Sequence, residues 1–282
     1  MPMNRQQHTI CILVLIFFKL SRGHPELLGC QENMTTVKKR AAVSFTGGKD
    51  CHLAMERALT SGDYEIVCLV VFASKAHSSR AHPDTWKETQ AKALGLPLQV
   101  YHVDKVDDCY KKGYAQAIIT LHDKYKIDTL ITGDIDYVGN ATSNFMTDVC
   151  KLHVPHVTVW LPLWHAHRED LLREMMVERQ FRMIFSCVKT PLDETWIGRT
   201  LDQDAVQEIK AMGTVDLSGE NGEYHTMVVW SPSYQFPLKL VFDQSAAAGP
   251  AAQELTDLPF QNPAQRVWVC NPTAELRVDS LP

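Results

Sequence analysis

The sequence contains a pair of glycines followed at once by a lysine and an aspartate, Gly47-Gly48-Lys49-Asp50. Paired glycines let the chain turn sharply and let an anion approach the backbone amides with no Cβ in the way. Apolar residues recur at helical spacing after the pair, so these amides are expected to open a helix, whose free N–H groups and dipole attract anions. The predicted ligand is a phosphate or pyrophosphate. A plain turn between a strand and a helix is the alternative.

The pattern is not a Walker A loop, in which four residues separate two glycines before Lys and Ser or Thr. It resembles the PP-loop, the Ser-Gly-Gly-Lys-Asp-Ser signature of ATP pyrophosphatases, which cleave ATP between the α and β phosphates. Thr46 and Cys51 stand where the signature has serine. Threonine retains the hydroxyl group, whereas cysteine is a weaker hydrogen-bond donor.

Two other stretches carry polar groups that suit a binding site. Gly133 and Asp134 directly follow an apolar run, and an acid at such a turn can hold Mg2+ through water, although a helix-capping aspartate is the alternative. The stretch Gly219–Trp230 brings acidic, amide and imidazole groups to the mouth of a predicted strand. A tight hairpin turn would explain its glycines, but not the neighbouring Glu223 and His225.

Strands and helices alternate along the first half of the chain and must position these groups. The predicted strands are Ala41–Phe45, Glu65–Phe72, Leu98–Val103, Thr129–Thr132 and His156–Leu161. The predicted helices between them are Asp50–Ser61, Pro83–Leu94, Tyr110–Tyr125 and Asn144–Leu152. This order predicts an α/β fold with a doubly wound parallel sheet, in which ligands bind at the carboxyl ends of the strands. Gly47–Cys51, Val71–Ala73 and Gly133–Asp136 would then share one rim.

The pattern of predicted strands and helices changes near Pro162-Leu163-Trp164. A helix over Arg168–Gln180, a strand over Phe181–Val188 and a helix over Asp202–Met212 predict a second, smaller α/β domain. We therefore expect an ATP-binding domain over residues 37–162 and a substrate domain over 163–243. Residues 244–282 are rich in Ala, Pro and polar residues, which predicts a disordered tail.

Residues 1–36 are expected to be an extension outside these domains. Their apolar run, Ile10–Phe18, is shorter than the roughly 20 residues that span a bilayer, but it has the length of a signal-peptide core. Because Ser21-Arg22-Gly23 is a poor cleavage site, and Met34 lies just before the first strand, we expect a start at Met34 and a cytoplasmic protein. A secretory signal is the alternative.

Composition excludes some classes of function. The 282 residues carry a formal net charge of −5, which does not favour wholesale binding to nucleic acid. The eight cysteines include no C-x-x-C pair, which argues against a zinc ribbon or an iron–sulfur cluster. Reduced and mostly buried thiols are expected instead.

Taken together, the motifs resemble those of the diphthine–ammonia ligase family of PP-loop ATPases. They span roughly residues 40 to 240 in the family's order and comprise Thr46–Cys51, Gly133–Ile135, Pro162–Trp164, Asp193–Asp202 and Gly219–Thr226. The resemblance implies a HUP-type nucleotide-binding domain followed by a smaller family-specific domain. It also implies a reaction in which ammonia is joined to the carboxyl group of diphthine, a modified histidine of elongation factor two. ATP would yield AMP and pyrophosphate.

The resemblance assigns roles to particular residues. Lys49, Asp50, Glu223 and His225 would be catalytic, and Asp50 or Asp134 would hold Mg2+. The diphthine arm or ammonium would contact Glu220, Asn221, Gly222, Glu223 and His225. ATP would be bound by Ser44, Thr46, Gly47, Gly48, Lys49, Asp50, Cys51, Val71, Phe72, Gly133 and Asp134.

One departure from the family pattern keeps alternatives open. The family usually carries an Arg-x-Glu-like element where this chain has Asn144–Thr147. The chain could therefore be a PP-loop enzyme that acts on another acyl acceptor or on tRNA. A nucleotide-binding module without catalytic activity is the remaining alternative. The basic loop containing Lys75, His77, Arg80 and His82 could meet phosphates or substrate, or lie in solvent.

Overall fold

We describe a computed structural model of the chain. It describes residues 37–73, 79, 81–106, 109–242, 251–256, 265–270 and 274–279. The predictions for residues 1–36 and for Lys75, His77 and Arg80 therefore lie outside the described residues. From Thr36 onward the chain forms one compact unit.

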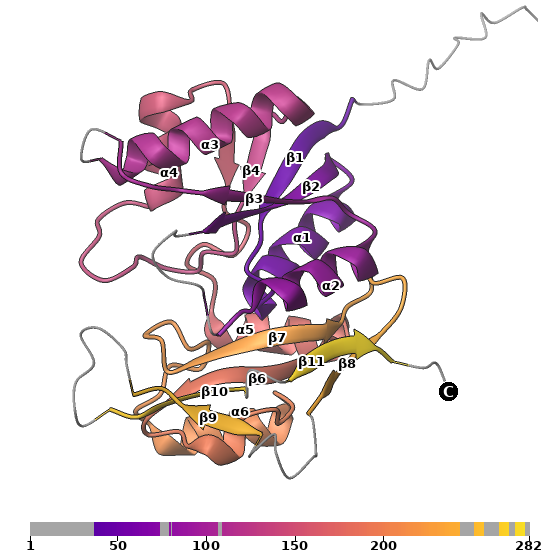
Figure 1. Cartoon of the computed structure of the whole chain (residues 1–282), viewed down its shortest axis with the longest axis vertical. Helices are drawn as coiled ribbons and strands as arrows, with labels where there is room; N and C mark the ends of the chain where they lie inside the picture. Colours follow the sequence, from indigo (N-terminus) through magenta and orange to yellow (C-terminus); the bar gives the residue numbers. More distant parts are fainter. Residues whose placement is uncertain are drawn as a thin grey trace, which may run out of the picture. The chain divides into compact units, whose positions relative to one another are not determined.

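A five-stranded parallel sheet forms the first part of this unit (Figure 1). Its strand order is β3-β2-β1-β4-β5, so the chain proceeds outward from β1 in one direction and then returns to add β4 and β5 on the other side. The strands are β1 (Lys39–Ser44), β2 (Tyr64–Ala73), β3 (Leu98–His102), β4 (Thr129–Ile131) and β5 (Thr158–Trp160). The direction reverses between β1 and β4, and ligands bind at such a switch point in doubly wound sheets. The predicted fold class is confirmed.

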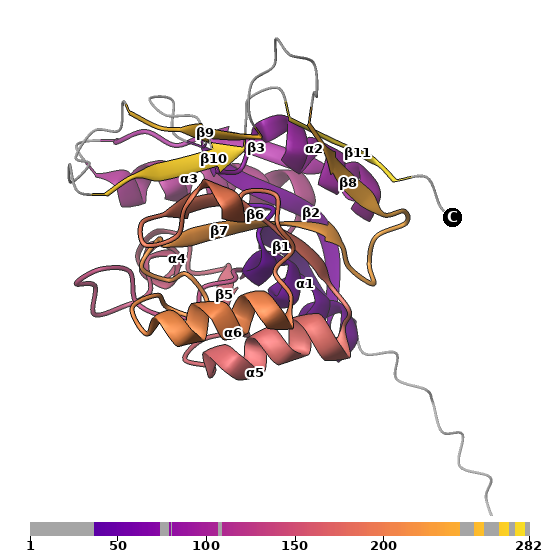
Figure 2. The same cartoon turned by 90° about the horizontal axis from the view of Figure 1, so that it is seen from below.

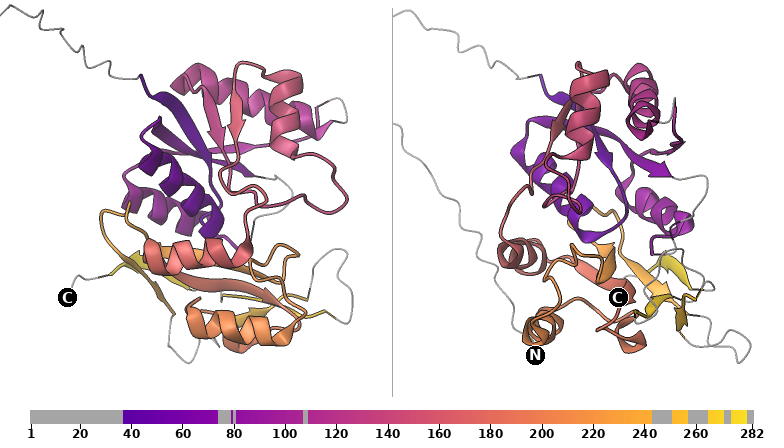
Figure 3. Two further views of the ribbon diagram at one scale, coloured as in Figure 1. Left: turned by 180° about the vertical axis from the view of Figure 1, so that it is seen from behind. Right: turned by 90° about the vertical axis from the view of Figure 1, so that its left-hand side faces the viewer.

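Alternate residues of β1 enter two different cores, because successive side chains of a strand point to opposite faces. Ala41 and Val43 join the core beneath α1 and α2, whereas Ala42 joins the core beneath α3 and α4. The sheet is thus covered on both faces, as Figure 3 shows from two sides. These helices are α1 (Lys49–Ser61), α2 (Asp84–Leu94), α3 (Tyr110–Tyr125) and α4 (Phe145–His153).

The second part of the unit is built on antiparallel strands (Figure 2). A four-stranded sheet has the order β7-β6-β10-β9, and β11 pairs with β8. The strands are β6 (Arg182–Lys189), β7 (Tyr224–Trp230), β8 (Leu238–Val241), β9 (Ala252–Glu254), β10 (Val267–Cys270) and β11 (Glu275–Val278). The helices are α5 (Arg168–Arg173), the π-helix η1 (Glu174–Glu178), the 3₁₀-helix η2 (Glu194–Trp196) and α6 (Gln203–Met212). One hydrophobic core extends from α1 and α2 into this sheet.

The prediction of a disordered tail is wrong for the described residues after 250. β10 pairs with β6, and β11 pairs with β8, so both are integral to the second part. Trp268 and Leu276 are each only 6% exposed, and this burial stabilises segments whose composition alone predicts disorder. The boundary between residues 162 and 163 stays a prediction.

Five of the six described cysteines are buried and all six are free thiols, as expected. Among the described residues, none of the helices is long and apolar enough to cross a membrane.

Candidate active site

The Gly47–Cys51 loop joins β1 to α1 as predicted. Gly47 has a φ of +85°, a left-handed conformation that favours glycine, and Gly48 is the N-cap of α1. The Gly48 carbonyl oxygen accepts hydrogen bonds from the Cys51 thiol at 3.1 Å and from His52 Nδ1 at 2.9 Å. This carbonyl is thus turned into the protein, and the N–H groups of the first helical turn that have no protein acceptor are candidate donors for an anion.

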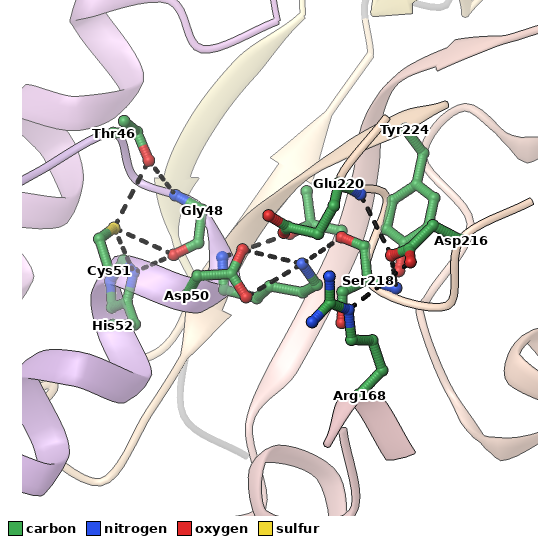
Figure 4. Close-up of polar contacts among 12 residues, drawn as sticks. Thr46, Gly48, Asp50, Cys51, His52, Arg168, Asp216, Ser218, Glu220 and Tyr224 are labelled. Carbon is green, nitrogen blue, oxygen red and sulfur yellow. Dashed lines mark hydrogen bonds and ion pairs between the residues drawn. The ribbon is translucent and has the colours of Figure 1, made fainter. Parts of the chain in front are cut away.

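Cys51, which stands where the PP-loop signature has serine, is held within the loop by hydrogen bonds. Burial raises the pKa of its thiol, while a hydrogen bond from Thr46 opposes the rise. The thiol therefore stays protonated and donates to the Gly48 carbonyl oxygen. Thr46 Oγ1 lies 3.6 Å from the sulfur and 3.5 Å from the Gly48 amide nitrogen, so both substituted positions of the motif remain within the loop's hydrogen-bond network (Figure 4).

Strand β7 holds the loop from the other part of the unit. The Gly47 carbonyl oxygen accepts from the Val228 amide at 3.1 Å and from Gln90 Nε2 at 2.9 Å. The buried Thr226 hydroxyl oxygen accepts from the Lys49 amide at 3.3 Å. The second part of the unit thus supports the Gly47–Cys51 loop through β7, which the sequence did not reveal.

A buried histidine supports the loop from within α1. His52 is fully buried, and this burial lowers its pKa to about 4, so the imidazole is neutral near pH 7. Because Nδ1 donates to the Gly48 carbonyl, Nε2 accepts from the Tyr234 hydroxyl at 2.9 Å. The same hydroxyl lies 3.0 Å from the Val228 carbonyl oxygen and shares its single proton between these two acceptors, so Tyr234 connects the loop to β7.

Lys49 and Asp50 form the charged centre of the site. Lys49 is 3% exposed, and its Nζ lies 2.8 Å from Asp50 Oδ2 and 2.7 Å from the Ser218 carbonyl oxygen. It also lies 5.6 Å from the centre of the Tyr224 ring. This arrangement places a buried cation between the PP-loop and the loop that precedes β7.

Gly133 brings the loop after β4 against the same helix end. A Cβ built on Gly133 would lie 2.5 Å from the Asp50 carbonyl carbon and 2.6 Å from the Cys51 amide nitrogen, so the approach requires glycine. The neighbouring Asp134 carboxylate accepts from Thr132 at 3.0 Å and from Asn144 at 2.6 Å. Asn144 also caps α4, so Asp134 is oriented by two elements.

A cavity of about 540 Å³ opens at this rim. Its volume falls within the range of small-molecule sites, about 300–1,000 Å³. Many wall residues were predicted for the nucleotide: Ser44, Thr46, Val71, Phe72, Ala73 and Asp134. Tyr114 contributes an aromatic wall, with its ring 5.1 Å from that of Phe72 and 5.0 Å from that of Phe145. None of Glu220–His225 lines this cavity.

The loop before β7 uses Glu223 for its own structure. This buried carboxylate accepts from the Asp216 amide, the Asn221 amide and the Asn221 side chain, at 3.0, 3.0 and 3.2 Å. Gly222 has a φ of +74°, and Lys189 donates to the Asn221 carbonyl at 3.0 Å. Glu223 therefore braces the loop, while its predicted catalytic role stays a prediction.

Glu220 projects from that braced loop and lies next to Asp50 in Figure 4. Partial desolvation raises the pKa of Glu220 to about 7, the Asp50 charge adds to this rise, and Lys49 and Arg168 oppose it. The residue remains exposed to solvent. A carboxyl group that titrates near neutrality can both accept and donate a proton.

His225 meets a histidine from the first part of the unit. The ring centres of His225 and His82 lie 5.2 Å apart, and His82 Nε2 donates to the Thr226 carbonyl oxygen at 3.2 Å. Desolvation lowers the pKa of His225 to about 4 and that of His82 to about 3, with Lys49 adding to both shifts. His82 also lines the cavity, so this member of the predicted basic loop reaches the site.

Arg168 is a site residue that the sequence reading placed only on an amphipathic helix. Its guanidinium lies 3.0 Å from Asp136 Oδ2 and 3.6 Å from Asp216 Oδ2. It thereby ties the loop after β4 to the loop before β7, and Figure 4 shows its side chain next to Asp216. A single arginine at the start of a charged helix carries no local signal for such a role.

The donors present fit ATP and a magnesium ion held mainly by the nucleotide. Within the described ranges, no three His, Cys, Asp or Glu side chains gather to hold a metal ion by themselves. Mg2+ commonly uses one or two carboxylates with phosphate oxygens and water. Asp50, whose backbone Gly133 approaches, and Asp134, which follows Gly133, could supply those carboxylates.

Comparisons with known proteins show the family to which the chain belongs. Family models for the diphthamide synthase N-terminal and C-terminal domains match residues 39–153 and 167–248. The human diphthine–ammonia ligase is 26% identical over 237 residues, covering 73% of this chain and 84% of that protein. The rat ligase is 27% identical over 240 residues, covering 74% and 84%.

A structural likeness was also found to a predicted subunit of tRNA methyltransferase from Methanocaldococcus jannaschii. It covers 68% of this chain and 97% of that one at 18% identity, and its TM-score of 0.37 supports no conclusion about function. The two domain matches, in order and over most of the described chain, carry the assignment. The chain belongs to the diphthamide synthase, or diphthine–ammonia ligase, family of ATP-dependent carbon–nitrogen ligases.

Proposed function

We propose that this chain converts diphthine on elongation factor two to diphthamide, using ammonium and cleaving ATP to AMP and pyrophosphate. The observation that carries the proposal is the PP-loop, in which the Gly47 and Gly48 carbonyl oxygens accept hydrogen bonds from the protein and the buried Lys49 begins α1. Such an arrangement stabilises the negative charge that develops on departing pyrophosphate. Family membership supports the choice of acceptor.

In the proposed reaction a carboxylate oxygen of diphthine attacks the α-phosphorus of ATP, and the bond to the β-phosphate bridging oxygen breaks. Ammonia nitrogen then attacks the activated carbonyl carbon, and the bond to AMP breaks. Lys49 and the amides of Gly47 and Gly48 would hold the phosphates. Val71 and Phe72, near the end of β2, would contact the adenine, because both line the cavity. Bound Mg2+ would neutralise phosphate charge, with Asp50 and Asp134 as its protein ligands.

Ammonium must lose a proton before its nitrogen can attack. We assign this proton transfer to Glu220 rather than to Glu223, because Glu223 is engaged in three hydrogen bonds within its loop. The pKa of Glu220 near 7 suits a general base. His225, with its pKa lowered to about 4, would be neutral and could accept a hydrogen bond from the incoming amine.

The test is a product assay with the full chain, ATP, Mg2+ and ammonium, with and without elongation factor two that carries diphthine. AMP and pyrophosphate that appear only with this acceptor would support the proposal. AMP formation without dependence on the acceptor would instead favour another substrate, and ADP would contradict the PP-loop chemistry. Lys49→Ala should abolish AMP formation while the protein stays folded.

A further inference from the structure

Three aromatic rings gather where the loops after β4 and β5 meet. The ring centres of Tyr137, Trp164 and His165 lie 5.1, 5.2 and 4.7 Å apart pairwise, and their planes are inclined by 54° to 85°. The His165 amide donates to the Ile135 carbonyl at 2.8 Å, which joins the two loops. Because β4 and β5 are paired neighbours, the cluster sits at the carboxyl edge of the sheet, where ligands bind.

The cluster is open to solvent. Tyr137 is 43% exposed and the His165 side chain 49%. Rings that served only to anchor these loops would be buried, as the neighbouring Leu163 is. Tyr137 also lines the cavity together with Asp134 and Asp136, so the exposed rings adjoin the proposed nucleotide site.

One carboxylate, that of Asp136, lies against the cluster. Asp136 Oδ1 lies 3.6 Å from His165 Nδ1, and its other oxygen pairs with Arg168. Arg168 is shared with Asp216, so two carboxylates face one guanidinium.

Aromatic faces next to a carboxylate bind quaternary ammonium groups, which are cations that cannot donate hydrogen bonds. We propose that Tyr137, Trp164 and His165, with Asp136, bind the quaternary trimethylammonium group of the acceptor. This inference rests on the proposed function, because diphthine carries such a group on the carbon next to its reacting carboxylate. The trimethylammonium group and the reacting carboxylate of the acceptor must therefore lie side by side, just as the aromatic cluster lies beside the cavity.

Tyr137→Leu removes a ring from an exposed loop position, and Tyr137→Phe is the matched control that retains the ring. The assay compares elongation factor two carrying the trimethylated side chain with the same protein whose side-chain nitrogen is unmethylated. Wild type and Tyr137→Phe should have a higher kcat/KM for the trimethylated form than for the unmethylated form. In Tyr137→Leu the ratio of these two values should be roughly three- to 30-fold smaller, which is the range for a cation–π contact. An unchanged preference would overturn the inference.

A binding experiment separates this inference from the proposed function. Saturation transfer NMR follows the methyl protons of betaine, a trimethylated amino acid, with glycine as the unmethylated comparison. Transfer from wild type and Tyr137→Phe, with loss in Tyr137→Leu, supports the site even if neither form of elongation factor two is converted. Equal transfer in all three proteins refutes it. Absence of turnover with either acceptor would refute the proposed function alone.

Discussion

Replacing Gly133 by alanine should separate the loop after β4 from the start of α1. The added Cβ would lie 2.5 Å from the Asp50 carbonyl carbon, whereas ordinary contacts begin at 3.4 Å, so the loop must move by about 0.9 Å. The obstructing atoms are backbone atoms at a helix end and cannot rotate aside as a side chain would. Gly133 itself has no left-handed φ, so the contact is the main source of strain.

Asp134 moves with this loop, and a displacement near 1 Å commonly lowers catalysis about 100-fold. We expect kcat/KM for AMP formation to fall by roughly this factor, with a loss of about 1–3 kcal/mol in the free energy of unfolding from overpacking. Steady-state AMP formation and urea denaturation measure the two effects.

The control is Gly213→Ala, at the C-cap of α6. Gly213 has a φ of +66° and nothing within 4 Å of a built Cβ, so alanine there should cost about 1–2 kcal/mol from backbone strain alone. Its activity should remain that of wild type. If Gly133→Ala kept wild-type activity, or if both variants lost activity alike, the argument from close approach at Asp50 would be refuted.

Three further predictions concern titration and support of the loop. Glu220→Gln should lower kcat by about 10²–10⁴-fold and abolish the rise of rate with pH near 7; a retained rise would exclude Glu220 as the base. Tyr234→Phe should cost about 1–3 kcal/mol, because it leaves buried His52 Nε2 without its donor, and denaturation showing no loss would contradict that bond. The free energy of unfolding of the wild type should decrease as pH falls from 6.5 towards 4. In this range His52 binds a proton in the unfolded state but not in the folded state, where burial lowers its pKa to about 4. His52→Gln should flatten this dependence in denaturation at several pH values, and an unchanged slope would assign it to other groups.

The sequence predicted the first sheet well because its signals are local. Each strand of that sheet is a short apolar run, and Gly47-Gly48 marks the turn into α1 directly. The second part was harder because its strands pair over long distances. Four-residue β10 depends on β6, some 80 positions earlier, and nothing within Val267–Cys270 reveals that partner.

The structure brings together Lys49, Asp50 and Gly133, which the motifs singled out, while their catalytic and binding roles stay predictions. Glu223 was expected in a pocket because acid and imidazole groups cluster nearby, yet three donors from its own loop satisfy it. Arg168 was missed because its two carboxylate partners lie far away in sequence.

The central claim is that the PP-loop directs attack by a substrate carboxylate on the α-phosphorus of ATP. The most direct test labels the reacting carboxylate of diphthine on elongation factor two with oxygen-18 and follows the label by mass spectrometry after one round of ligation. The account predicts one labelled oxygen in AMP and none in pyrophosphate. Label in inorganic phosphate together with ADP, or unlabelled AMP beside the amide product, would contradict it.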